Sequence, residues 1–246
     1  IYIRKPNEKV QGKVKLTMLS GIVKAGTNIL GGESGGNTDP TKTLTDMIFR
    51  NGVLETGIEG GKENAKIFGM GTESFIGCSN VYIGGVMKID STIKDSSGKT
   101  VDVKGGVYGG INNIAGATVS HKGTAKVTYD TLATNTNGEI FGGHLGNVVT
   151  TDGGSTYVLL DNGTFYGNIY GGSDNNDTTA LATSKVTLDG CTIEGSIYGG
   201  SKTKGTVNNA YINLYDGNIP NSKNAVFGSG CGTGTKVVNS RIEIDG

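Results

Sequence analysis

The side chains of this chain that could carry out acid or base chemistry are mainly aspartates that precede glycine. They recur at Asp189, Asp216 and Asp245, and Asn51 and Asn162 occupy the same position in related segments. Carboxylate pairs are the catalytic groups of most glycosidases, so a row of them could act on a polysaccharide. Asp and Asn before Gly are also typical of tight corners, where the side chain bonds its own backbone. We therefore expect these five residues to be corner residues.

Further candidates for chemistry are Asp130, Asp152, Asp161 and His144, which would converge only if adjacent segments of the chain lay side by side. An isolated histidine is more often a surface or hydrogen-bonded residue than a catalytic base. We predict no catalytic residue, no metal site and no cofactor. The opposing hypothesis, a polysaccharide lyase or hydrolase, requires two carboxylates that meet in a cleft.

The three cysteines, Cys78, Cys191 and Cys231, are odd in number and form no C-x-x-C pair. At least one has no partner within the chain, and the sequence does not decide whether all three are free. Because a free cysteine behaves as a small apolar residue, we expect each of them in a core.

Composition narrows the kinds of partner. The chain of 246 residues has 22 basic and 22 acidic side chains, so its overall charge favours neither nucleic acid nor an anionic membrane. No stretch approaches the roughly 20 apolar residues of a membrane span. Glycine is the outstanding residue, with 44 copies against 3 prolines, and it lacks the three-residue period of collagen. We predict no nucleic-acid partner and no membrane span.

A repeated segment is the strongest structural signal. It consists of Ile or Val, usually an aromatic residue, and two small residues, and most copies follow one another at about 28 or 29 residues. Alternating residues and an Asp-Gly, Asn-Gly or Gly-Gly corner precede most copies, which is the pattern of strands joined by tight turns. The seven copies are residues 29–32, 58–61, 107–110, 140–143, 169–172, 197–200 and 226–229.

Short strands at regular intervals are compatible with antiparallel hairpins or with a parallel β-helix. The β-branched residue at one position of every repeat favours the β-helix, because one winding per repeat would stack these residues at about 4.8 Å in an interior column. No apolar pattern with a period of 3.6 residues indicates helices. We predict an all-β, single-stranded parallel β-helix of roughly seven coils, with about 28–29 residues in each coil.

An aromatic column follows the β-branched one. Because neighbouring residues of a strand point to opposite faces, we expect the β-branched residues to point inward and the aromatic ones outward. An outward row of rings could stack on a carbohydrate or contact a protein, or the rings could pack on one another and on the adjacent glycines. The candidate binding residues are Tyr108, Phe141, Tyr170, Tyr198 and Phe227.

We expect residues 1–246 to form one β-helix domain that belongs to a longer repeat array. Two segments depart from the period. Residues 86–106 are expected to form a protruding hairpin with a turn at Ser97-Gly98, and residues 33–43 a surface loop. The sequence stops in the first half of a repeat without a visible cap, so we expect an end-to-end or adjacent-domain contact there.

Where Ile-Tyr-Gly-Gly follows Asp-Gly in successive repeats, the chain resembles the glycine-rich repeat regions of large bacterial surface proteins. These are adhesin-like molecules with a pectate-lyase-type, right-handed β-helix, and the resemblance covers nearly the whole chain. It implies an extracellular or cell-surface location and an adhesin-like rod or stalk that binds a glycan or a host or cell-surface protein. Since the same coil also carries enzymes, the polysaccharide enzyme stays an alternative, and a self-assembling fibre subunit is another.

Overall fold

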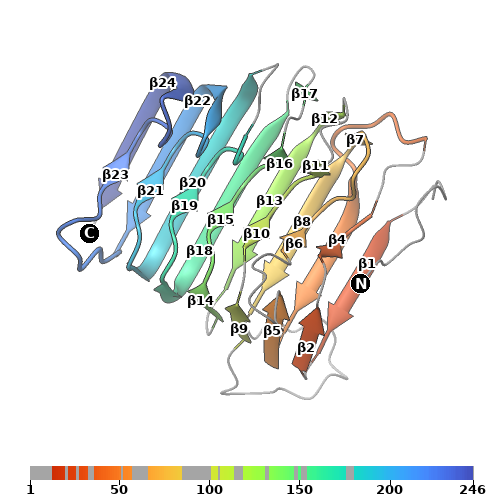
Figure 1. Ribbon diagram of the computed structural model, residues 1–246, viewed down its shortest axis with the longest axis horizontal. Coiled ribbons are helices and arrows are strands. Elements are labelled where there is room, and N and C mark those ends of the chain that lie inside the picture. The colour runs from red at the N-terminus through yellow and green to blue at the C-terminus, as the bar shows by residue number, and fades with distance from the viewer. Residues whose placement is uncertain are drawn as a thin grey trace.

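The computed structural model describes residues 13–19, 22–25, 28–32, 36–50, 52–56, 66–84, 101–104, 106–113, 119–130, 133–146, 149–150, 154–175 and 180–245. These residues form strands and connecting loops, and successive windings lie side by side from the N-terminal to the C-terminal end (Figure 1). None of them forms a helix that could cross a membrane.

The largest sheet, called here the long sheet, has twelve strands. A first row runs the length of the molecule, and a second, shorter row pairs with the far end of β18 through Asn135 and Phe165. The first row is β1 (Val14–Met18), β4 (Thr43–Phe49), β8 (Cys78–Ile83), β13 (Thr124–Tyr129), β18 (Ser155–Phe165), β20 (Leu181–Ile193), β22 (Lys204–Tyr215) and β24 (Gly234–Asp245). The second row is β14 (Ala133–Asn137), β9 (Val101–Lys104), β5 (Gly52–Thr56) and β2 (Ile22–Ala25).

A seven-stranded sheet carries the repeated segment. Its two-residue strands are β3 (Ile29–Leu30), β6 (Ile67–Phe68), β10 (Val107–Tyr108), β15 (Ile140–Phe141), β19 (Ile169–Tyr170), β21 (Ile197–Tyr198) and β23 (Val226–Phe227). Two small sheets complete the windings, one of β7 (Phe75–Ile76), β12 (Ser120–Lys122) and β17 (Val149–Thr150), and one of β11 (Asn112–Asn113) and β16 (Leu145–Gly146).

Strand pairing among the described residues is parallel throughout. The predicted all-β parallel solenoid is therefore confirmed. It has about five turns, slightly fewer than the roughly seven predicted. The seven-stranded sheet has one strand per repeat, but β3 and β23 each have a neighbour on one side only, so counting repeats overstates the number of complete turns.

The second copy of the repeat was predicted at residues 58–61 because they end in two glycines, and this prediction was wrong. Val107 pairs with Ile67, and Ile67 pairs with Ile29, so the second strand of the column is Ile67-Phe68 and not Ile58-Glu59. Residues 57–65 lie outside the described residues. In a glycine-rich chain Ile-x-Gly-Gly arises by chance, whereas Ile67-Phe68-Gly69 has the aromatic residue and one glycine at the place where the backbones crowd.

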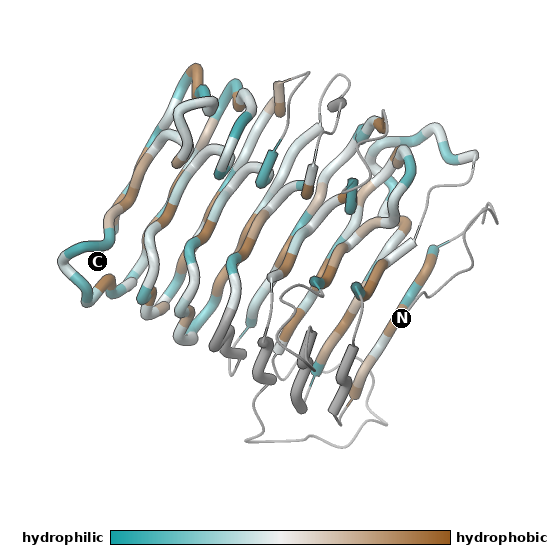
Figure 2. The backbone as a smooth tube through the Cα atoms, viewed as in Figure 1, coloured by the Kyte–Doolittle hydropathy of each residue, from teal (hydrophilic) through white to brown (hydrophobic). Residues whose placement is uncertain are grey.

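The β-branched residues point inward, as predicted. Ile29, Val107, Ile140, Ile169 and Ile197 are at most 1% exposed and belong to one core cluster with the inward side chains of the long sheet. Figure 2 shows hydrophobic segments at the same place in successive windings. Burying an aliphatic side chain stabilises the fold by about 1.5–3 kcal/mol, and here that contribution repeats with each winding.

The first glycine after the aromatic residue of each repeat lies close to the long sheet, and in several windings its carbonyl oxygen accepts a hydrogen bond from a Ser or Thr hydroxyl. The Thr45 hydroxyl donates to the carbonyl oxygen of Gly69 (2.6 Å), and the Thr156 hydroxyl donates to that of Gly171 (2.5 Å). Ser184 donates to Gly199 in the same way. The backbones of adjacent windings approach closely at this glycine, so a side chain in its place would collide with the backbone of the next winding.

The departures from the period differ in part from the prediction. Val101–Lys104 forms β9, which pairs parallel with β5 and β14, so this part of residues 86–106 is a rung of the long sheet and not an arm of a hairpin. The expected turn at Ser97-Gly98 lies outside the described residues. Of residues 33–43, the described ones from 36 to 42 form a largely exposed loop held by Asn37, whose amide donates to the Ile76 carbonyl (2.8 Å).

Candidate functional site

The predicted aromatic column forms a continuous stack of rings on the seven-stranded sheet. Tyr108, Phe141, Tyr170, Tyr198 and Phe227 lie on adjacent windings, with ring centroids 4.4–5.0 Å apart and interplanar angles of 6–9°. Tyr108, Phe141 and Tyr170 belong to a cluster separate from the main core, and Tyr198 packs against it, as expected for side chains on the opposite face of each strand. Each stacked pair contributes about 0.5–1.5 kcal/mol beyond the burial of its surface.

The exposure of this stack changes along the solenoid. Tyr108, Phe141 and Tyr170 are 1–2% exposed, Tyr198 is partly buried and Phe227 is 41% exposed. Rings that are almost fully buried have no free face for a ligand. Binding by this column stays a prediction, and stacking on a sugar would have to use the two C-terminal rings.

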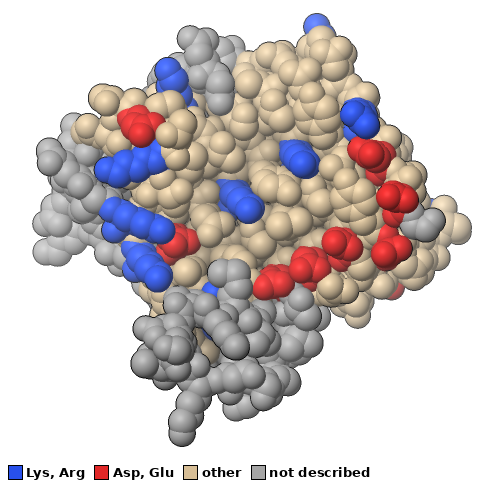
Figure 3. Space-filling view, turned by 180° about the vertical axis from the view of Figure 1, so that it is seen from behind, with Lys and Arg blue, Asp and Glu red and all other residues tan. Residues whose placement is uncertain are grey.

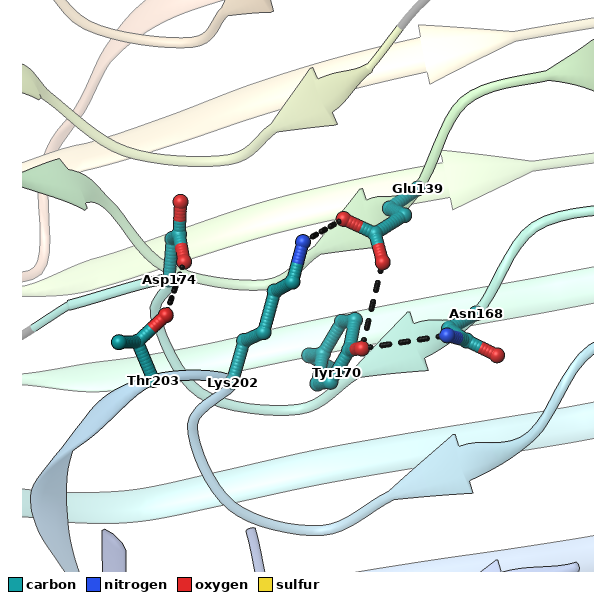
Figure 4. Close-up of polar contacts among 6 residues, drawn as sticks. All are labelled: Glu139, Asn168, Tyr170, Asp174, Lys202 and Thr203. Atoms are coloured by element: carbon teal, nitrogen blue, oxygen red, sulfur yellow. Dashed lines mark hydrogen bonds and ion pairs between the residues drawn. The ribbon is translucent and has the colours of Figure 1, made fainter. Parts of the chain in front are cut away.

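Polar side chains gather over the stack at Tyr170 (Figure 4). Lys202 reaches across from the winding that carries β21 and forms an ion pair with Glu139, with Nζ 2.5 Å from Oε2. The Tyr170 hydroxyl donates to the other carboxylate oxygen of Glu139 (3.2 Å) and accepts from the Asn168 amide (3.2 Å). Burial, followed by the charge of Glu139, raises the pKa of Tyr170 well above its usual range. The phenol therefore stays protonated and acts as a donor.

A second pair lies beside this cluster. The Thr203 hydroxyl donates to Oδ1 of Asp174 (2.9 Å), 29 residues away on the preceding winding. Lys202 and Glu139 are 63 residues apart, and the winding of β19 lies between theirs. Both contacts therefore stabilise the stacking of the windings.

A groove of about 450 Å³ begins at Glu139. Its floor is backbone, because Gly138, Gly167 and Gly195 follow one another on adjacent windings, each two residues before a β-branched residue of the repeat. The side chains along it offer an exposed ring, two carboxylates and two amides: Tyr166, Glu139, Glu194, Asn168 and Asn224.

The groove side chains are positioned by the stacking of the windings. The Asn224 amide donates to the Glu194 carbonyl (2.5 Å), and Oδ1 of Asn168 accepts the Ser196 amide (2.8 Å). Tyr166 is 54% exposed, so its ring is available to a ligand.

Sequence reasoning missed this groove, although the chain carries a signal for it. A glycine stands two residues before the repeat in three successive windings, in Asn-Gly-Glu-Ile, Tyr-Gly-Asn-Ile and Glu-Gly-Ser-Ile. Such a column needs the same register in every winding to become a groove, and the register is known only once the coil is built.

The acidic residues form a column at one corner of the long sheet. Asp189 pairs with Asp161 on one side and, through Tyr215, aligns with Asp245. Asp161 also contacts Asp130, and burial followed by the charge of Asp130 raises the pKa of Asp161. Of the candidates for chemistry, the structure brings Asp130 and Asp161 together, whereas Asp152 lies outside the described residues.

The corner itself lies one residue further on. Asn162 and Asp216 both have a φ of 47° and Gly190 a φ of 60°, the left-handed backbone of a tight turn. Asn and Asp tolerate this conformation better than other residues with a side chain, so the corner role predicted for Asn162 and Asp216 is confirmed. Asp189 and Asp245 lie in β20 and β24, one position before the corner, so the corner role predicted for them was wrong, and Asn51 lies outside the described residues. The Asn162 amide also donates to the carboxylate of Asp161 (2.6 Å).

His144 does not meet the aspartates. It is fully buried beside His121, with ring centroids 5.0 Å apart, and its Nδ1 accepts the Ile111 amide (2.9 Å). The neutral His144 ring therefore carries its proton on Nε2. Nε2 of His144 and Nδ1 of His121 have no hydrogen-bond partner among the described residues.

Burial of this histidine pair predicts an acid-sensitive fold. Burial lowers the pKa of His121 to about 4, and burial followed by the charge of His121 lowers the pKa of His144. Above about pH 6.5 both rings are neutral in the folded and unfolded chains. Below it the unfolded chain binds protons that the folded chain excludes, so stability falls between about pH 6.5 and pH 4, by about 3 kcal/mol for His121.

The check is chemical denaturation at several pH values, comparing the wild type with His121→Phe. Carboxylates protonate in both proteins, so the difference between their pH slopes isolates the histidine. Parallel slopes for the two proteins between pH 7 and pH 5 would rule the effect out.

The cysteines are free, and they differ in burial. Cys191 is buried as predicted, and burial raises the pKa of its thiol to about 11. Cys78 is partly buried and donates to the Pro40 carbonyl (3.2 Å). Cys231 is exposed, so its expected place in a core was wrong, since it lies on a loop of the last winding. In the ranges that the structure describes, no group of three His, Cys, Asp or Glu side chains could hold a metal ion.

The last winding exposes apolar side chains. Ile244 is 74% exposed, Ile242 is 41% exposed and Val238 is 54% exposed. A cavity of about 410 Å³ between Leu188, Ile244 and neighbouring residues opens at the same end. Ile242 and Ile244 pair with the buried Ile212 and Leu214, so they continue the core column and form its exposed end.

Comparison with protein families, with curated proteins and with solved structures finds no match for this chain.

Proposed function

We propose that this chain is a non-enzymatic extracellular module, an adhesin-like rod whose side binds a glycan or a protein partner. The parallel stacking of windings supports the rod, because each winding is held by its neighbours and surface features repeat along its length. The observation that carries the proposal is the groove along Gly138, Gly167 and Gly195. It crosses several windings and presents an exposed ring beside hydrogen-bonding groups.

The chemistry of the groove suits a neutral glycan. A sugar ring has an apolar face of C–H groups and a rim of hydroxyls. The Tyr166 ring can cover the apolar face, and the carboxylate of Glu194 and the amide of Asn224 can accept from and donate to the hydroxyls. A backbone floor lets the sugar approach closely.

The proposal is tested by screening the protein on an array of neutral oligosaccharides and titrating the best ligand. Tyr166→Ala should weaken binding about tenfold or more, because an aromatic anchor is lost. Tyr215→Ala, a tyrosine on another side of the coil, is the matched control and should bind like the wild type. If no oligosaccharide binds, or if both variants bind equally well, the groove is not a glycan site.

A polysaccharide lyase or hydrolase is the alternative that one observation favours, because Glu139 and Glu194 line the same groove. Two carboxylates across a glycosidic bond are what such enzymes require. Glu139, however, is already paired with Lys202 and bonded by Tyr170. A reducing-end assay on acidic and neutral polysaccharides decides: turnover that is lost in Glu194→Gln would replace the binding proposal, and no turnover by the wild type is expected.

A self-assembling fibre subunit is a third candidate, supported by the apolar end around Ile242 and Ile244. End-to-end contact would cover these side chains with a winding of another copy. Sedimentation over a range of concentrations separates a fibre from a rod, since only a fibre gains mass as concentration rises.

A further inference from the structure

A regular column of basic and aromatic side chains runs along the outer face of the long sheet. The register pairs Lys126 with Tyr157, Tyr157 with Lys185, Lys185 with Tyr211, and Tyr211 with Arg241. These five residues, on β13, β18, β20, β22 and β24, are called here the cation–tyrosine ladder. Because side chains alternate across a strand, all five point away from the core that their buried neighbours fill.

The central part of the ladder leaves two ammonium groups without a counter-charge. Nζ of Lys126 lies 5.1 Å and Nζ of Lys185 5.4 Å from the centroid of the Tyr157 ring. Neither lysine has an ion pair with a described carboxylate, although Arg241 is 3.3 Å from Glu243. The Tyr157 ring attracts both ammonium groups and so holds the two lysine side chains in place, while their charges remain open to solvent.

The spacing of the cations is set by the windings. Adjacent parallel strands are about 4.8 Å apart, and the basic residues occupy every second strand, so the charges recur at about 10 Å in a straight row. A row of this kind matches a long anion with repeated charges better than it matches a single small anion.

Neutral polar side chains lie beside the ladder. Thr183 and Asn209 precede it on their strands by two residues, and Asn213 follows it by two. They supply hydroxyls and amides of the kind that bond sugar hydroxyls. Figure 3, which views the molecule from behind, shows separate basic side chains over the middle of this face and a row of acidic ones near its edge.

We propose that the cation–tyrosine ladder binds an extended acidic polysaccharide lying along the axis of the rod. The proposal deepens the proposed function, on which it rests, by adding a second surface and naming the chemistry of its ligand. The carboxylate or sulfate groups of the polymer pair with Lys126, Lys185 and Arg241, and its hydroxyls meet the neutral columns. The acidic column of Asp161 and Asp189 borders the site and keeps the polymer to one track.

The same geometry disfavours a nucleic acid. Proteins that bind single strands offer free aromatic faces on which bases stack. The Tyr157 ring has ammonium groups near it on both neighbouring strands, so a base has no free face there.

The test is a binding titration of the whole chain with polygalacturonate and dextran sulfate as acidic probes, dextran as the neutral probe and poly(dT) as the nucleic acid. The wild type should bind the acidic polysaccharides, more weakly as salt is added, and should not bind poly(dT). Dextran carries no charge to pair with the lysines, so any binding of it belongs to the groove and should not depend on salt. Lys126→Gln with Lys185→Gln should weaken binding about tenfold or more. Lys42→Gln with Lys223→Gln removes the same charge elsewhere and should leave binding unchanged.

Several outcomes overturn the inference. They are no binding of either acidic probe, equal binding of poly(dT), and equal loss in the two double variants. Thermal unfolding of the Lys126 and Lys185 variant confirms that it is folded before its binding is measured. Neutral-glycan binding at the groove distinguishes the two proposals: if the groove binds and the ladder does not, only this inference fails, and if neither binds, the proposed function fails as well.

Discussion

Ile169→Asp should unfold the windings around it and not merely loosen one strand. Ile169 is fully buried, pairs with Ile140 and Ile197, and donates its amide to the Ser196 carbonyl (2.9 Å). The core cluster around it contains no charged side chain, so a carboxylate here has no counter-charge, and an uncompensated buried charge costs about 3–5 kcal/mol. Since neighbouring repeats stabilise one another, the loss should spread along the coil.

The measurement is thermal and urea unfolding followed by circular dichroism. The expected result is a large fall in the midpoint and a broader transition, because a domain of this kind has only about 5–15 kcal/mol of stability in total. Val238→Asp is the matched control, since the same carboxylate is placed on β24 at a side chain that is 54% exposed. Unfolding of Ile169→Asp at the wild-type midpoint would contradict the inward column.

The parts of the fold that follow from local pattern were predictable from the sequence. Ile or Val at one position of each repeat requires a common environment, and a parallel coil is the arrangement that provides it. The corner residues also follow from local chemistry, because Asn162 and Asp216 adopt the left-handed backbone that their side chains tolerate.

The parts that depend on register were not predictable in the same way. A shift of the second repeat from Ile58 to Ile67 changes the partner of every side chain in that winding. The two histidines meet because β12 and the segment after β15 are adjacent in space, and their types alone do not indicate this. The aromatic column was found by its residue type, but the Tyr170 ring is covered by Phe141 and Tyr198 and its hydroxyl is bonded to Glu139, all of them on other windings.

The groove and the cation–tyrosine ladder also depend on the register of the windings, so the sequence alone did not predict them. Gly138 and Gly167 are ordinary glycines until stacking aligns them, and Lys126 and Lys185 are ordinary surface lysines until β18 brings Tyr157 between them. Sites on a solenoid are columns, and a column has one residue from each repeat. A sequence read along the chain therefore shows each site one residue at a time.

Gly142→Ala should destabilise the fold although it adds a single methyl group. A Cβ at this position would lie 2.5 Å from the Gly171 carbonyl oxygen and 3.0 Å from Cβ of Thr156, closer than such atoms approach in proteins. The Gly171 oxygen is backbone and also accepts the Thr156 hydroxyl, so neither neighbour can move freely. The windings must separate, which strains the bond from the Gly142 amide to the Tyr170 carbonyl (2.9 Å).

Overpacking of this kind costs about 1–3 kcal/mol, and the upper part of that range is expected because the obstructing atoms are backbone. Gly217→Ala is the control: its Cβ would meet nothing closer than the Cys191 carbonyl oxygen at 3.7 Å, an ordinary contact. That variant should be as stable as the wild type or slightly more so, because alanine restricts the unfolded chain. Urea unfolding measures the stability of the two variants and shows whether glycine is required sterically at position 142. Equal stability of the two variants would mean that the close approach of the windings is not the reason for glycine in the repeat.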